Sequence, residues 1–256
     1  MNNINLDSFF YGTLLGDSYF HNGVFYCKQI SKDLIEFKYK VIKDNLPNVK
    51  IKIDEYKEYI DKNNIKHQDY YVISASGNDY LKSLNNLFYN DNKKICPINI
   101  INKLDYLGMA MWFADDGATI LVQRNESTGS AKCHRTQLCT DSFTKEEHDN
   151  IIIPELKQLG YESNYKKRGE HYRIEFLKPK NIQNLYIEMG KYFYNYFPSL
   201  LYKLDMGYRN SSLLNRTYVI QEYYEFYNKI STHPLFIDRM KIKEDIVRTT
   251  TTNIGS

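Results

Sequence analysis

Apolar residues recur at helical spacing in two short segments of the chain. The first segment, SFFYGTLLGDSYF, covers residues 8–20, and the second, LGMAMWFADDGAT, covers residues 107–119. Large apolar side chains fall on one helical face in each, which predicts two buried helices. Each segment also has small residues four positions apart, which share one helix face. These small residues are Gly12 and Gly16 in the first segment and Ala110 and Ala114 in the second.

Both predicted helices end in acidic residues, Asp17 in the first and Asp115 and Asp116 in the second. Gly117 follows, and a glycine can end a helix by adopting a left-handed conformation. The C-terminal end of a helix carries partial negative charge, so an unpaired carboxylate is unfavourable there. Small residues let two helices approach closely, so we expect these helices to pack together and to bring Asp17 and Asp116 to one point. A divalent cation would relieve the resulting repulsion.

Each segment opens a repeat of the same element order. The first repeat contains a motif helix at about residues 7–18, then hairpins and helices whose limits are marked by turn and cap residues. These later elements are a hairpin turning at Asn22 and Gly23, an amphipathic helix after Ser31, strands at 49–56 and 70–76, and a helix at 78–89 opened by Asn78.

The second repeat follows the same order after its motif helix. Thr144 and Glu147 form a capping box, Pro154 predicts a kink in the helix that follows, and Gly160 predicts its end. The remaining elements are strands at 119–124 and 134–140, joined by residues 125–132, a hairpin at 161–176 turning at 168–170, and a helix at 179–197.

The pattern αββαββα therefore occurs twice and predicts an α+β fold with two pseudo-symmetric half-domains. We assign residues 1–100 to the first half-domain and residues 101–210 to the second. Residues 211–256 form a C-terminal extension, with an amphipathic helix at 217–230 and a disordered tail. The helices cover one face of each antiparallel sheet, and the other face is left free.

The free sheet faces carry basic and amide side chains, which read base edges in the major groove of DNA. A strand of about ten residues is ~33 Å long and duplex DNA rises ~3.4 Å per base pair, so each half can follow about nine base pairs. The candidate contacts are His21, Lys28, Lys50, Lys52, Gln123, Arg124, Lys132, Arg135, Lys166, Lys167, Arg168 and Arg173.

Composition is compatible with this interpretation but does not require it. The chain of 256 residues is 42% hydrophobic and 15% aromatic, which indicates a folded protein. Its net charge is only +3, so a local basic surface matters more than the total. The four cysteines form no CxxC pair, which favours a reduced intracellular protein. No apolar run is long enough to span a membrane, and the N-terminus has no recognisable targeting segment.

The paired motifs SFFYGTLLGDS and GMAMWFADDG resemble those of the LAGLIDADG homing endonucleases in their single-chain, two-motif form. Three further stretches are similar to that family: NNLFYNDNKKICP before the second motif, TDSFTKEE after it, and LLYKL near residue 203. The resemblance covers about residues 7–205 and is strongest to intron-encoded mitochondrial enzymes. It implies a saddle of two antiparallel sheets with the motif helices at the central interface.

The resemblance also implies the site residues. Asp17 and Asp116 would bind the catalytic metal, because the last glycine of the second motif falls on Gly117. Gly16 and Asp115, which precede these acids, complete the candidate metal set, with Asp115 the weaker candidate. The family keeps a basic residue near each metal, which matches Lys94 in KKICP and Lys203 in LYKL. An ammonium group can orient the attacking water or offset charge on the phosphate.

The resulting hypothesis is a monomeric DNA endonuclease that uses Mg²⁺ or Mn²⁺, with Ca²⁺ as a non-productive substitute. Its target is double-stranded DNA of about 18–22 base pairs, estimated from the reach of the strands. We expect an intracellular protein, mitochondrial if it is encoded in an organelle and cytoplasmic otherwise. Three alternatives stay open from the sequence: an RNA maturase acting on an intron RNA, a catalytically inactive DNA-binding regulator, and an unrelated α+β enzyme with a coincidental repeat.

Overall fold

The computed structural model describes residues 4–62, 65–124, 131–206 and 219–240, and the side chains of these residues except at 121–134. The first half begins with α1 (Leu6–Leu15). The elements that follow are β1 (Tyr19–His21), β2 (Val24–Gln29), α2 (Lys32–Asn45), β3 (Lys50–Tyr56), β4 (Tyr59–Ile60), β5 (Lys66–His67), β6 (Tyr70–Ser76), α3 (Asp79–Phe88), β7 (Tyr89–Asn90), β8 (Lys93–Lys94) and the 3₁₀ turn η1 (Ile101–Lys103).

The second half begins with α4 (Tyr106–Asp116). It continues with β9 (Gly117–Arg124), β10 (Ala131–Cys139), α5 (Lys145–Glu147), the π turn η2 (His148–Ile152), α6 (Ile153–Gln158), β11 (Ser163–Arg168), β12 (His171–Phe176), α7 (Pro179–Tyr196) and the 3₁₀ helix η3 (Pro198–Leu204), and the extension adds α8 (Gln221–Ser231).

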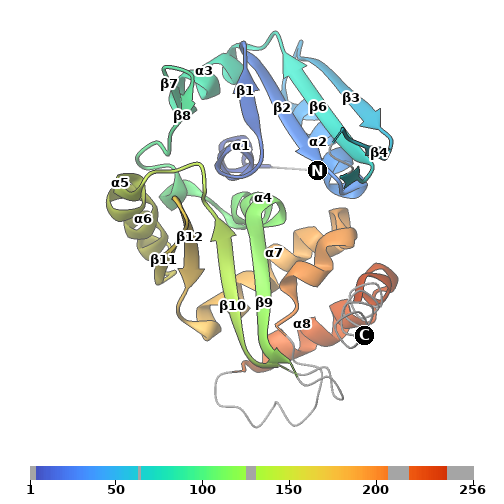
Figure 1. Cartoon of the computed structure of the whole chain (residues 1–256), viewed down its shortest axis with the longest axis vertical. Helices are drawn as coiled ribbons and strands as arrows, with labels where there is room; N and C mark the ends of the chain where they lie inside the picture. The colour runs from blue at the N-terminus through green and yellow to red at the C-terminus, as the bar shows by residue number, and fades with distance from the viewer. Residues whose placement is uncertain (1–3, 63–64, 125–130, 207–218, 241–256) are drawn as a thin grey trace.

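Two four-stranded antiparallel sheets form the frame, in the orders β1-β2-β6-β3 and β11-β12-β10-β9. Figure 1 shows α1 and α4 next to each other at the centre, with the first sheet above them and the second below. In each sheet one edge strand, β1 or β9, directly follows a motif helix along the chain. The predicted α+β fold with two αββαββα units is confirmed.

Local turn and cap signals operate as the sequence predicts. Asn22 and Gly23 both have positive φ and connect His21 to its paired residue Val24, as a two-residue hairpin requires. Thr144 and Glu147 form the predicted capping box. Around Pro154 the helix is interrupted by the π turn η2, since proline cannot donate the backbone hydrogen bond of a regular helix.

The motif helices touch at glycines. A Cβ atom added to Gly12 would collide with the backbone of Gly108, and one added to Gly108 would collide with Ser8. Ser8 also donates a hydrogen bond of 2.6 Å from its hydroxyl to the carboxylate of Asp105, which caps the N-terminus of α4. The backbones of α1 and α4 are therefore in direct contact at Gly12 and Gly108, a position outside the Ala110 and Ala114 pair that the small-residue spacing indicates.

Two buried or partly buried carboxylates fix the segment that connects the halves. Glu155 of α6 accepts backbone hydrogen bonds from Asn99, Ile101 and Asn102 at 2.5–3.2 Å. Glu147 accepts another from Cys96 at 2.7 Å. Backbone N–H groups are costly to bury without acceptors. Their hydrogen bonds to the two glutamates therefore hold residues 96–102 against the second half.

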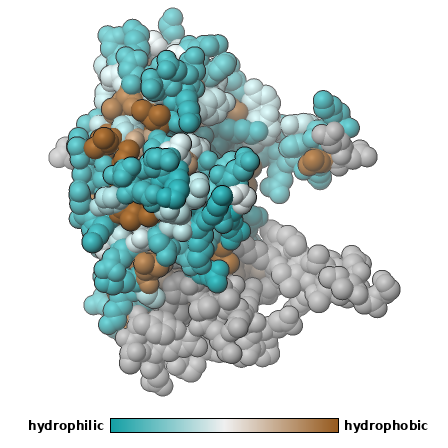
Figure 2. Space-filling view, turned by 60° about the vertical axis from the view of Figure 1, so that its left-hand side comes forward, coloured by the Kyte–Doolittle hydropathy of each residue, from teal (hydrophilic) through white to brown (hydrophobic). Residues whose placement is uncertain are grey.

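The core extends from the motif helices into both halves, and Trp112, Phe113, Phe9 and Phe10 have no exposed surface. On the face shown in Figure 2, hydrophilic residues predominate and hydrophobic residues form small separate patches. Such a surface suits a charged or polar partner better than a partner with a large apolar surface. Within the described residues, none of the helices has the length and apolar character needed to cross a bilayer.

The contact between the motif helices yields the first prediction. Gly12→Ala should lower the free energy of unfolding by about 2–4 kcal/mol, because the added methyl group meets backbone that cannot move aside. Urea denaturation, monitored by circular dichroism, measures this change in the free energy of unfolding. Asn86→Ala on the exposed face of α3 is the control and should stay within about 0.5 kcal/mol. A Gly12→Ala protein as stable as this control would contradict the packing described here.

Candidate active site

Asp17 and Asp116 lie at the C-terminal ends of the two motif helices. The helix α1 ends at Leu15, earlier than the predicted limit of residue 18, so the exposed Asp17 lies two residues beyond it. Asp116 is the last residue of α4. Gly117 is extended, with φ −77° and ψ 145°, so the predicted left-handed ending is wrong. Glycine is needed there because an added Cβ would collide with Phe113.

The close packing of the helices brings three carboxylates together. Gln29 of β2 donates hydrogen bonds from its amide to Asp17 at 3.2 Å and to Asp115 at 2.9 Å. Burial raises the pKa of Asp116 well above its usual range, and the nearby Asp17 and Asp115 carboxylates raise it further. The expectation that Asp17 and Asp116 meet where the helices end therefore holds in the structure.

Asp115 differs from its neighbour because its carboxylate is already paired. Both of its oxygens accept hydrogen bonds of 2.7 Å from the ammonium of Lys38, and neither side chain is exposed. Burial opposes the charge on Lys38, but Asp115 outweighs this effect and the pKa of Lys38 is raised. Asp115 is thus part of an ion pair. Among the described contacts, Asp17 and Asp116 accept no hydrogen bond from a lysine.

Lys94 and Lys203 occupy equivalent positions at the two helix ends. The ammonium of Lys94 donates to the carbonyls of Gly16 at 2.7 Å and Ser18 at 3.1 Å. The ammonium of Lys203 donates to the carbonyls of Ala114 at 2.7 Å and Asp115 at 3.0 Å. A cation is favourable at the negative end of a helix dipole, so each lysine stabilises one motif helix end.

Both lysines are costly to bury in the charged form. Burial lowers the pKa of Lys94 to about 8, although Asp116, Asp115 and Asp17 favour its charge. Burial likewise lowers the pKa of Lys203. The ammonium groups of Lys94 and Lys203 thus lie near the acids but have lost much of their contact with water.

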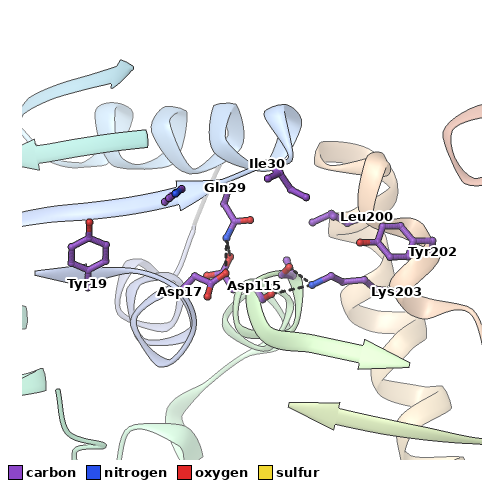
Figure 3. Close-up of a pocket in the computed structure, with 10 residues that line it drawn as sticks. Asp17, Tyr19, Gln29, Ile30, Asp115, Leu200, Tyr202 and Lys203 are labelled. Carbon is purple, nitrogen blue, oxygen red and sulfur yellow. Dashed lines mark hydrogen bonds between the residues drawn. The ribbon is translucent and has the colours of Figure 1, made fainter. Parts of the chain in front are cut away.

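A cleft opens beside the helix ends, with a volume of about 440 Å³. Figure 3 shows Asp17, Gln29 and Asp115 together on one side of it and Lys203 on the other. Leu200 and Tyr202 of η3, and Tyr19 and Lys28 of the first sheet, also line this cleft.

The donor set fits a divalent cation of the magnesium type. Mg²⁺ prefers oxygen ligands and takes one or two protein carboxylates, with substrate phosphates and water in its other positions. Asp17 and Asp116 supply two carboxylates, and the carbonyls of Gly16 and Asp115 lie at the same helix ends. In the described part of the chain there is no group of three or more His, Cys, Asp or Glu side chains that could hold a metal by themselves.

Most predicted DNA contacts that the structure describes lie on the exposed sheet faces. In the first sheet, the pairs Lys52 with Ser74 and Lys28 with Val72 place alternate residues of each strand outward. Residues on this face are His21, Lys28, Lys50 and Lys52, and those on the second sheet are Arg135, Lys166, Arg168 and Arg173.

The remaining predicted contacts do not fall on these described faces. Lys167 lies on the opposite face of β11, because residues 166 and 168 face outward and side chains alternate along a strand. The side chains of Gln123, Arg124 and Lys132 lie outside the described residues. Several of the outward cations are paired, since Lys166 contacts Glu175 at 2.6 Å and Arg173 contacts Asp141 at 3.2 Å.

Gln29 and Lys38 are the site residues that sequence reasoning missed. Both occupy core-facing positions of regular elements. Lys38 falls on the apolar stripe of α2 with Leu34, Phe37 and Val41, which are buried. Gln29 continues the buried alternation of Phe25 and Cys27 along β2. A polar residue at a core position of an amphipathic pattern needs a buried partner, and that signal was available in the sequence.

A sequence profile of the LAGLIDADG DNA endonuclease family matches residues 7–185. The chain belongs to this family. The fold is also shared with a solved structure. The homing endonuclease I-WcaI bound to its DNA recognition sequence has a TM-score of 0.64 and 21% identity, covering 78% of this chain and 85% of that one. Mesophilic variants of the homing endonuclease I-DmoI give a TM-score of 0.42 and 12% identity, covering 72% and 93%.

The lowered pKa of Lys94 predicts a pH-dependent stability in this LAGLIDADG protein. Its value is about 8 in the folded state, against ~10.4 in an unfolded chain. Between these values the unfolded state binds more protons, so stability rises with pH. Relative to Lys94→Met, the wild type should gain up to about 1.4 kcal/mol per pH unit between pH 8 and 10.

Urea denaturation of metal-free protein across this pH range measures the gain. Lys93→Met, at an exposed neighbouring position, is the matched control and should follow the wild type at every pH. Parallel curves for the wild type and Lys94→Met would show that the ammonium of Lys94 is not desolvated.

Proposed function

We propose that this protein is a site-specific endonuclease that binds a long double-stranded DNA target and hydrolyses both strands with a divalent metal ion. The observation that carries the proposal is the convergence of Asp17 and Asp116 at two adjacent helix ends, with Lys94 and Lys203 beside them. Membership of the LAGLIDADG DNA endonuclease family supports the same reaction class. The fold is also that of I-WcaI, a homing endonuclease solved on its DNA recognition sequence.

Each residue has a role that follows from its position. Asp17 and Asp116 would hold the cation. Burial and the neighbouring acids raise the pKa of Asp116, and a cation bound there would relieve the repulsion between the carboxylates. It would also supply the chemistry of lowering the pKa of a water molecule and stabilising negative charge on the phosphate. Lys94 and Lys203 lie next to the acids and offset the charge that develops as the phosphodiester is attacked.

The two exposed sheet faces would hold the duplex. Their outward cations include Lys28 and Lys50 in the first half and Arg135 and Arg168 in the second. Antiparallel strands fit the major groove, and the longest strands, of seven residues in the first sheet and nine in the second, would cover about 16 base pairs of a target of about 18–22. Because one chain carries both halves, a monomer is sufficient to reach both strands.

The proposal predicts that Asp17→Asn and Asp116→Asn each reduce cleavage by at least about a thousandfold while duplex affinity stays within about tenfold. Wild-type protein is incubated with Mg²⁺ and a pool of randomised duplexes, and cut molecules are sequenced to obtain a target. Cleavage rates and affinities of the variants are then measured on that target, with affinity measured in Ca²⁺.

Asp44→Asn, on the exposed face of α2, is the control for the loss of one negative charge and should cleave like the wild type. An RNA maturase or an inactive regulator would give no cut molecules from the pool at any Mg²⁺ concentration. Equal cleavage by wild type and either active-site variant would refute the roles given to the two acids.

A further inference from the structure

The ion pair of Lys38 and Asp115 joins the two halves of the molecule inside the site. Lys38 comes from α2 of the first half and Asp115 from α4 of the second. The ammonium contacts both carboxylate oxygens at 2.7 Å and the sulfur of Cys27 at 3.5 Å. With both side chains inaccessible to solvent, the pair is of the buried kind, in which removing one partner leaves an uncompensated charge.

The first motif helix is shaped around this pair. A Cβ atom on Gly16 would lie 2.7 Å from the Cβ of Asp115 and 2.8 Å from its Oδ2. The space that a side chain at residue 16 would fill is therefore occupied by the Asp115 carboxylate. Gly16 precedes Asp17 just as Asp115 precedes Asp116, so residues 16 and 115 are equivalent positions of the two motifs. There is room for only one side chain between them, and that side chain is the carboxylate of Asp115.

The pair has no counterpart across the pseudo-symmetry axis among the described residues. Lys38 lies seven residues after the N-cap Ser31. The same count from the N-cap Thr144 reaches Ile151, and the extra residue of the π turn moves the equivalent position to the buried Ile152. The symmetry-related positions are thus an apolar residue of the second half, Ile152, and a glycine of the first half, Gly16.

Gln29 connects the pair to a metal-binding carboxylate. Its amide nitrogen lies 2.9 Å from Asp115 and 3.2 Å from Asp17, and one NH₂ group can donate to both. Fixing Asp115 therefore fixes the donor that orients Asp17. Without Lys38, Asp115 would instead be a third free carboxylate beside Asp17 and Asp116.

We propose that Lys38 is a positioning residue: it holds Asp115 as a neutral pair, so that Asp115 orients Asp17 through Gln29 and does not itself bind the cation. This inference rests on the proposed metal-dependent function. It gives Asp115 a role different from the ligand role that the motif alone suggests. The cation then has two carboxylate ligands from the chain, and the third acid contributes only through its hydrogen bonds.

Two variants separate a positioning pair from a metal ligand. Asp115→Asn leaves the buried ammonium of Lys38 unpaired near the metal position, and Mn²⁺ affinity of the DNA-free protein should fall about tenfold. Lys38→Met with Asp115→Asn removes both charges and should restore the affinity to within about threefold of wild type. If Asp115 were a ligand, the double variant would stay as weak as the single one. Mn²⁺ titration followed by electron paramagnetic resonance gives these affinities.

The exposed pair of Lys40 and Asp44 on α2 is the matched control. Asp44→Asn, and the double variant with Lys40→Met, change the same number of charges and should bind Mn²⁺ like the wild type. Should Asp115→Asn fail to fold, the double variant still discriminates: wild-type affinity excludes a ligand role for Asp115, and a loss of about tenfold overturns the proposal.

The proposal is overturned by a double variant that binds about tenfold more weakly than wild type. It is also overturned if wild type, Asp115→Asn and the double variant all have the same Mn²⁺ affinity, or if none of the three binds Mn²⁺. Cleavage rates against Mg²⁺ concentration should show the same order. Because the Mn²⁺ titration contains no DNA, a wild type that binds Mn²⁺ but cuts no duplex would refute the proposed function and leave this test in place.

Discussion

The backbones of α1 and α4 are in direct contact at Gly12 and Gly108, and the geometry of the candidate active site depends on that contact. Two helices that touch without intervening side chains must end close together if they run side by side. Their C-terminal residues, Asp17 and Asp116, are therefore neighbours although they are remote in sequence. The two sheets lie on opposite sides of this helix pair (Figure 1).

This arrangement creates an electrostatic conflict that the chain resolves with buried lysines. Three carboxylates and the negative ends of two helix dipoles share a small volume, and each feature disfavours the others. Lys94 and Lys203 bind the helix-end carbonyls, and Lys38 pairs with Asp115. Burial of these ammonium groups is itself unfavourable, as the lowered pKa of Lys94 and of Lys203 shows. Strain of this kind is characteristic of sites selected for chemistry over stability.

The two halves share a frame but differ in detail. The hairpin of β1 and β2 has strands of three and six residues, whereas β9 and β10 have eight and nine. The first half also carries the additional small hairpin of β4 and β5. At the centre, the Lys38–Asp115 pair occurs on one side of the pseudo-symmetry axis and is replaced by an isoleucine and a glycine on the other.

Residue patterns within short segments were enough to predict the local structure and the arrangement of two similar halves. Turn glycines, N-caps and apolar periodicity act over a few residues, so the Asn22–Gly23 hairpin, the Thr144 capping box and the two αββαββα units were all predictable. The paired motifs were enough to bring Asp17 and Asp116 together. Tertiary structure alone decided that Gly108 makes the close contact, that Lys38 neutralises Asp115, and that Gln29 links Asp115 to Asp17. These choices depend on which side chains from distant segments reach the same buried volume, and spacing along one chain does not contain that information.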